Sequence, residues 1–177
     1  MKGEQMGKKT KWLCVTAIGI ALFVVLSMCV RVPVFENYYI CLGYVAMAVY
    51  CYSFGVVSGT AVGTQGVILY CVLTSGLRGM PGWTAGNLVI GIVLGLTFKA
   101  TKKMKSATLK FAINAVAVIL SVAVGILGVK SMTECVLYAQ PFLVRVAKNV
   151  YAAVADVVTL LVSLPVCMNL DRVFKKG

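Results

Sequence analysis

A long apolar stretch near the end of the chain contains the residues best suited to hold a small molecule. It runs from Phe142 to Met168 and is long enough to cross a bilayer as a helix. On a helical wheel, at about 100° per residue, its polar and small residues share one stripe roughly 100° wide. They are Arg145, Lys148, Asn149, Ala152, Asp156, Thr159 and Ser163. A charged side chain in mid-membrane costs roughly 2.5 to 3.5 kcal/mol, so this stripe should face other helices or a water-filled cavity.

The residue types on this stripe predict a ligand with an anionic end. Arg145 can hold a carboxylate or phosphate bidentately, and Lys148 adds a point charge beside it. Asp156 lies about 16 Å further along the helix axis, too far to pair with Arg145 directly. We expect it to accept a hydrogen bond from the ligand or from a neighbouring helix. In the alternative interpretation, the two cations only reach toward the lipid headgroups and Asp156 is a packing residue.

Other candidates lie on segments predicted to face the same side of the membrane. Trp83, with Tyr38 or Tyr39, is suited to stack on a planar ring. The loop around Arg78 is suited to close over the ligand as a lid. The predicted ligand-binding residues are therefore Arg145, Lys148, Asn149, Asp156, Trp83, Asn87, Arg78, Tyr38 and Tyr39.

The composition identifies an integral membrane protein. Of the 177 residues, 60% are hydrophobic and 12% are charged, about half the charged fraction of a soluble domain. The charges are concentrated between the apolar runs. We predict an all-α fold with a single membrane domain over residues 1–177. This domain includes a basic lead (1–11) and a basic tail (169–177).

Six apolar runs are predicted to cross the membrane. They cover residues 12–30, 40–57, a third run through Gly59 to about 75, then 84–98, 107–129 and 142–168. The first run is longer than the apolar core of ~7–15 residues expected of a signal peptide, so we expect it to be retained. The fourth is short and can begin within the preceding loop. Glycines four residues apart favour close helix packing: Gly55, Gly59 and Gly63, and again Gly91 and Gly95.

The distribution of basic residues predicts the orientation. Twelve of the 17 lie at the N-terminus, in the segment 99–110 and at the C-terminus. The other five are Arg31, Arg78, Lys130, Arg145 and Lys148. By the positive-inside rule, both termini and the segment 99–110 are cytoplasmic, and the loops 31–39, 77–83 and 130–141 are external. We therefore interpret the net charge of +12 as the signal that orients the chain in the cell membrane, and not as a sign of nucleic-acid binding.

The sequence gives little support to an enzyme. It has five carboxylates, of which only Asp156 lies inside an apolar run, and it has no histidine. Its seven cysteines show no CxxC spacing, and no GxxxxGK[ST] motif is present. We therefore predict no catalytic residues, no metal and no cofactor. A channel, another carrier or a small polytopic scaffold protein are the competing classes.

Several segments resemble the S component of energy-coupling factor (ECF) transporters. Ala17-Ile-Gly-Ile-Ala21 is similar to the AxxxA signature of that family. Residues 30–43 resemble its first outer loop and the start of its second helix, and residues 54–66 resemble its glycine-rich stretch. Residues 83–96 resemble its fourth helix. The second helix departs from the family pattern, because members often have Asp at the position of Tyr44. The resemblance covers most of residues 12–98.

The resemblance implies capture of a vitamin-like micronutrient from outside the cell. Delivery would then need a transmembrane coupling subunit and two ATPase subunits. Ala17 and Ala21 would dock on the coupling subunit; alternatively, they pack inside this protein against Gly55 and Gly59. The competing function is that of a membrane scaffold, similar in helical outline to rod-shape proteins.

Overall fold

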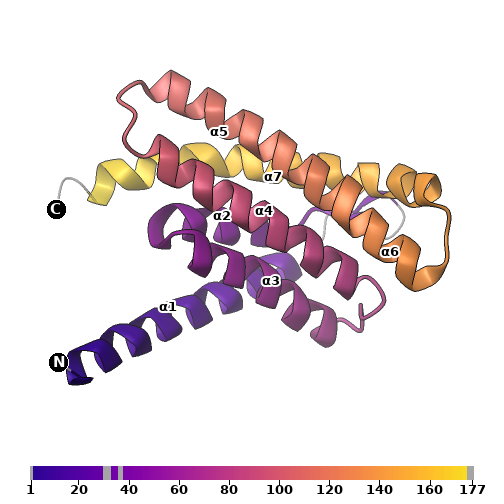
Figure 1. Ribbon diagram of the computed structural model, residues 1–177, viewed down its shortest axis with the longest axis horizontal. Coiled ribbons are helices and arrows are strands. Elements are labelled where there is room, and N and C mark those ends of the chain that lie inside the picture. Colours follow the sequence, from indigo (N-terminus) through magenta and orange to yellow (C-terminus); the bar gives the residue numbers. More distant parts are fainter. Residues whose placement is uncertain (1, 30–32, 36–37, 175–177) are drawn as a thin grey trace.

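The computed structural model describes residues 2–29, 33–35 and 38–174, with side chains over 9–29 and 40–170. The chain is largely helical (Figure 1). In order, the elements are α1 (Lys2–Cys29), β1 (Pro33–Phe35), β2 (Tyr38–Tyr39), α2 (Gly43–Phe54), α3 (Val56–Leu73), α4 (Met80–Thr101), α5 (Ala107–Val122), the π-helix η1 (Ala123–Lys130), α6 (Ser131–Tyr138) and α7 (Phe142–Phe174).

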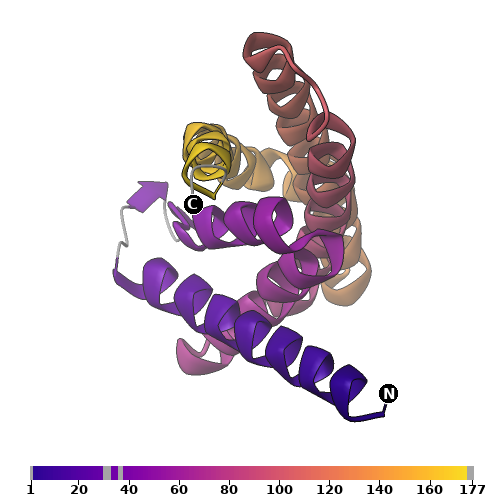
Figure 2. The same cartoon turned by 90° about the vertical axis from the view of Figure 1, so that its left-hand side faces the viewer.

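The helices form a bundle in which neighbours along the chain mostly pack together. α3 packs against α1, α2 and α4, and α7 packs against α2, α5 and α6. Viewed toward one end of the bundle, α2 lies between α1 and α7 (Figure 2). The two short strands pair antiparallel and contact α7. This arrangement places residues of α2, α4 and α6 next to the polar face of α7.

Five helical segments are long and apolar enough to cross a membrane. They are Lys9–Cys29, Val56–Leu73, Met80–Thr101, Ala107–Tyr138 and Phe142–Leu170. The protein is thus a multi-pass membrane protein. The remaining predicted crossing, the run 40–57, contains helix α2, which has only 12 residues. At 1.5 Å per residue it is about 18 Å long, less than the ~30 Å of hydrocarbon that a full crossing needs.

The basic lead is continuous with the first apolar run, because α1 begins at Lys2. One predicted boundary was wrong. The segment 130–141, predicted as an external loop, is helical to Tyr138, so that α5, η1 and α6 follow one another without a break. Polar residues of α6 suggested a loop, but Ser131 and Glu134 are buried while Met132 and Val136 are exposed. The fourth helix does begin within the preceding loop, at Met80.

The glycines allow the close helix packing that their spacing predicted. A Cβ at Gly59 would lie 2.5 Å from the backbone nitrogen of Cys51, which leaves no room for a side chain. Gly91 and Gly95 meet the backbones of Thr60 and Val56 in the same way. Gly55 alone separates α2 from α3, with φ of +90°, a conformation that favours glycine.

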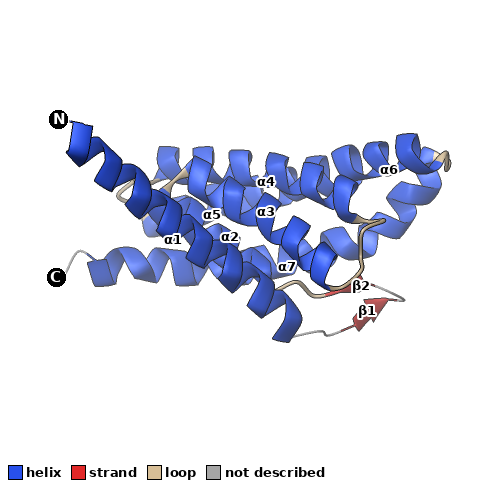
Figure 3. Ribbon diagram, turned by 90° about the horizontal axis from the view of Figure 1, so that it is seen from below, coloured by secondary structure: helices blue, strands red, loops and turns tan. Residues whose placement is uncertain are grey.

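The two ends of the bundle differ in composition. The start of α1, the α4–α5 connection and the end of α7 lie at one end, which we call the basic end (Figures 1 and 3). The strands, the α3–α4 loop and the α6–α7 corner lie at the other end. The three basic clusters of the sequence therefore share one side of the bundle, as the positive-inside rule requires.

We predict that the basic end is cytoplasmic. In a cysteine-free variant, a single cysteine at position 79, in the α3–α4 loop, should react with a membrane-impermeant maleimide on intact cells. A cysteine at position 103, in the α4–α5 connection, should react only after the cells are permeabilised. Labelling of position 103 but not 79 in intact cells would reverse the orientation.

Candidate ligand-binding site

A first group of polar side chains, the Tyr44 cluster, is buried between α2, α4 and α7. The indole nitrogen of Trp83 donates a hydrogen bond to the Tyr44 hydroxyl at 2.9 Å. That hydroxyl donates to Oδ1 of Asn87 at 2.7 Å. Nδ2 of Asn87 in turn donates to the carbonyl oxygen of Gly63 at 3.0 Å, which fixes the orientation of the amide. The carboxyl of Asp156 lies beside the same hydroxyl.

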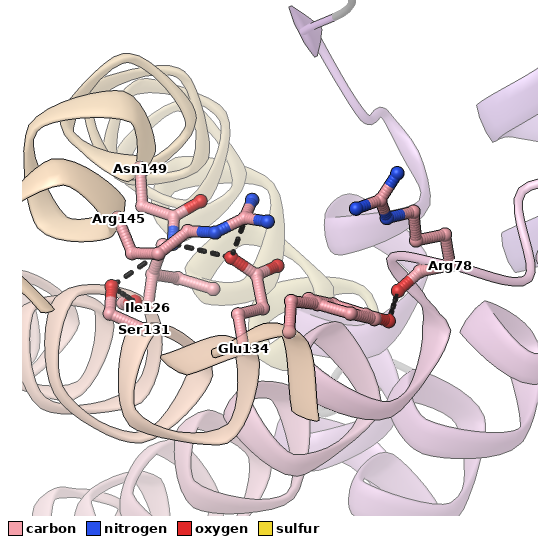
Figure 4. A network of polar contacts seen from close by, with 7 residues as sticks. Arg78, Ile126, Ser131, Glu134, Arg145 and Asn149 are labelled. Atoms are coloured by element: carbon pink, nitrogen blue, oxygen red, sulfur yellow. Dashed lines mark hydrogen bonds and ion pairs between the residues drawn. The ribbon is translucent and has the colours of Figure 1, made fainter. Parts of the chain in front are cut away.

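A second group, the Glu134 cluster, joins α6 to α7 (Figure 4). Asn149 donates hydrogen bonds from Nδ2 to Oγ of Ser131 at 3.0 Å and to Oε2 of Glu134 at 3.1 Å. Ser131 donates to the carbonyl oxygen of Ile126, in the π-helix. Arg145 lies 3.6 Å from the same Glu134 oxygen. One carboxylate oxygen thus accepts a hydrogen bond from the Asn149 amide and forms an ion pair with the Arg145 guanidinium, both on α7.

Lys130 connects the two clusters. It is the last residue of η1, it is 9% exposed, and it interacts electrostatically with both Glu134 and Asp156. Two cations, Lys130 and Arg145, and two carboxylates, Glu134 and Asp156, therefore lie in this part of the bundle. Arg145 and Glu134 form an ion pair, and such pairing makes a buried charge tolerable.

The outer edge of the site is formed by the aromatic ring of Tyr138. The guanidinium of Arg78 lies 5.0 Å from the ring centre and that of Arg145 lies 5.4 Å from it. The Tyr138 hydroxyl also donates a hydrogen bond to the backbone carbonyl of Arg78, as Figure 4 shows. The α3–α4 loop is thereby connected to α6 and α7 at the end of the bundle.

The polar stripe of α7 lies mostly where the helical wheel put it. Asn149, Asp156, Thr159 and Ser163 are buried, and Arg145 is partly buried. Lys148 differs from the others, because its side chain is exposed and does not join the buried stripe; its contact with a ligand stays a prediction. On the wheel it lies about 60° to one side of Arg145, at the edge of the stripe. A small rotation of the helix decides whether a residue at this edge faces the interior or the surface.

The remaining predicted ligand-binding residues have different surroundings. Trp83 and Asn87 lie in the Tyr44 cluster next to Asp156. Arg78 is on the exposed loop and contacts Tyr138. Tyr38 and Tyr39 form β2, and their side chains are outside the part of the structure that is described.

Four residues of the site were missed from the sequence. Tyr44 was noticed only because it differs from the Asp common in the resembling family, although it contacts three members of its cluster. Lys130, Ser131 and Glu134 were assigned to a loop. Their spacing of three and four residues, directly after a helical run, was the available signal, because it places them on one face of a continuing helix.

The proposed docking residues lie on the outer surface of α1. Ala17 and Ala21 are both exposed, among exposed apolar residues such as Ile18 and Leu22. The inward face of α1 carries Gly19 instead, which packs against Tyr50 and Val62. The alternative, in which Ala17 and Ala21 pack on Gly55 and Gly59, was wrong: a Cβ on Gly59 would meet Cys51 of α2.

Ionisable residues buried among membrane helices, as Glu134 and Asp156 are, mark this part of the bundle as the candidate functional site. The family described as "ECF-type riboflavin transporter, S component" matches residues 7–172, and the chain belongs to this family. It is thus a substrate-specific subunit of an ECF transporter. The S components are a family of transporter subunits and not a family of enzymes.

A curated relative supports the extent of the similarity. The chain is 28% identical over 150 residues to a "UPF0397 protein" of Streptococcus thermophilus (strain ATCC BAA-491 / LMD-9). The aligned region covers 82% of this chain and 81% of the relative. The similarity therefore extends over most of both proteins.

Proposed function

We propose that this S component captures riboflavin, or a similarly flat and neutral vitamin, from outside the cell. A coupling subunit and two ATPase subunits would then drive its delivery to the cytoplasm. The observation that carries the choice of ligand is the ion pair of Arg145 with Glu134, beside which Lys130 is buried near Glu134 and Asp156. Riboflavin is also the substrate after which the family is named.

The charge balance favours a neutral ligand over the anion that the sequence suggested. Arg145 is already paired with Glu134, and Lys148 is exposed. An anion entering this site would have to compete with Glu134 for the guanidinium. It would also lose hydration that the remaining groups do not replace. A neutral ring loses less on entering and needs only hydrogen-bond partners.

The polar groups of the site suit the edge of a flavin ring. That edge alternates hydrogen-bond donors and acceptors, and the amides of Asn87 and Asn149 carry both kinds of group. On binding, these amides would exchange their present partners within the bundle for the ring. Asp156 would accept from a ring N–H. Trp83, with Tyr38 or Tyr39, would stack on the ring, and the loop around Arg78 would close over it.

The proposal predicts that riboflavin binds the purified protein at least tenfold more tightly than its phosphate ester, flavin mononucleotide. A tenfold ratio corresponds to about 1.4 kcal/mol. Quenching of flavin fluorescence during titration measures both affinities in the same preparation. Tighter binding of the phosphate ester would restore the anion hypothesis, and binding of neither flavin would refute riboflavin as the ligand.

Two variants separate the roles of the cations. Arg145→Gln should weaken riboflavin binding at least tenfold, because it removes the ion-pair partner of Glu134 and disturbs the cluster. Lys148→Gln removes the same charge from the same turn of α7 and should leave the affinity within twofold. Equal losses in both variants would point to direct contact of both cations with an anion.

A further inference from the structure

The basic end of the bundle contains a second polar arrangement, far from the ligand site. Tyr52 of α2 is buried, and its ring packs edge-on against Phe98 of α4 at 5.4 Å between centroids. The hydroxyl of Tyr52 accepts a hydrogen bond from Nζ of Lys110. Nζ of Lys110 lies 4.9 Å and Nζ of Lys102 lies 6.0 Å from the centre of the same ring.

Two ammonium groups are thus held around one aromatic ring. Cation–π contact stabilises each of them there, but it does not neutralise their mutual repulsion. Lys102 is exposed directly after α4, whereas Lys110 lies on α5 and is 7% exposed. The two helices are joined here, because Thr101 of α4 donates a hydrogen bond to Oδ1 of Asn114 of α5 at 3.0 Å. The positions of Lys102 and Lys110 are therefore set by the fold and not only by the charge of the loop.

The surroundings add further positive charge. Lys103 and Lys105 are exposed on the α4–α5 connection, and Lys99 is exposed on the last turn of α4. Lys9 and Lys11 are exposed on α1 at the same end. The carboxylates within residues 9–29 and 40–170 are Glu134 and Asp156, and both belong to the candidate ligand site. A concentration of fixed cations of this kind attracts anions strongly.

The neighbouring surface is apolar. Leu96, Leu109, Phe111 and Ile113 are exposed on α4 and α5, beside the lysines. A phospholipid matches these two adjacent surfaces. Its phosphodiester headgroup would lie on the charged surface at the end of the helices, and its two acyl chains would lie on the apolar surface along them. A free phosphate would use only the charged part.

We propose that the basic end binds an anionic phospholipid at a site centred on Tyr52, with Lys102 and Lys110 as its main contacts. The headgroup lies between the two ammonium groups, and the acyl chains lie along α4 and α5. Through this contact the lipid holds the α4–α5 connection at the surface of the cytoplasmic leaflet. Each lysine near such a headgroup strengthens the attraction, so the effect of removing one is measurable.

The test compares variants in nanodiscs of equal parts phosphatidylglycerol and phosphatidylcholine, followed by native mass spectrometry of the lipids retained. Lys102→Gln, at an exposed position, should lower the phosphatidylglycerol preference about fivefold, and adding Lys110→Gln should lower it about fivefold again. Lys9→Gln with Lys11→Gln removes the same charge from exposed positions of α1 and should have little effect. Excess inorganic phosphate should not displace the lipid.

Three results would overturn the proposal. If the α1 pair lowers the preference as much as the Lys102/Lys110 pair, only the overall charge of this end matters. If Lys102→Gln leaves the preference unchanged, there is no headgroup contact at this site. Displacement by inorganic phosphate would assign the site to a free anion instead.

Discussion

Replacing Lys130 by Met should lower the free energy of unfolding by about 1 to 3 kcal/mol, because two buried carboxylates lose a neighbouring cation. Lys130 is buried and interacts electrostatically with Glu134 and Asp156. Methionine has a similar length and fills the same space, so the loss reports the missing charge and not a cavity. Unfolding by SDS, followed by far-UV circular dichroism, measures the difference.

Two further variants define what this loss means. Lys148→Met removes an exposed lysine from α7 and should change stability by no more than about 0.5 kcal/mol. Adding Asp156→Asn to Lys130→Met removes one of the carboxylates left without a cation and should recover at least half of the loss. A Lys130→Met protein as stable as the Lys148→Met protein would contradict the charge-paired site.

Much of the fold was predictable, because a membrane leaves the chain few choices. Backbone groups in hydrocarbon must bond within helices, so six apolar runs became six helical stretches. The polar stripe of α7 was predicted by the cost of exposing Asp156 to lipid, and Asp156 is buried. The single-residue turn at Gly55 followed from the short uncharged gap between two apolar runs.

The site was only half predictable, because its other half depends on contacts between helices. The wheel of α7 identifies a polar face but not the partners of Asn149 and Asp156. Those partners are Ser131, Glu134 and Tyr44, on helices far away in the sequence or hidden in a presumed loop. The length of α2 was also misjudged, since apolar residues flank it on both sides.

Placing tryptophan at both Ala17 and Ala21 should abolish vitamin uptake by cells and co-purification of the coupling subunit. The two residues are exposed one turn apart on α1, where a partner helix can approach the backbone closely. The opposite face of α1 packs through Gly19 against Tyr50 and Val62. The two substitutions leave this packing unchanged. Riboflavin binding by the isolated protein should therefore stay within twofold of the unchanged protein.

A matched pair on α5 separates docking from a general effect of bulk in the membrane. Val116 and Leu120 are also exposed and one turn apart, so tryptophan at both adds similar bulk elsewhere on the bundle. That variant should retain uptake and co-purification, because lipid accommodates added bulk where no helix packs. If the Ala17/Ala21 variant also loses riboflavin binding, these alanines support the fold itself. If it keeps the coupling subunit, α1 is not the docking surface.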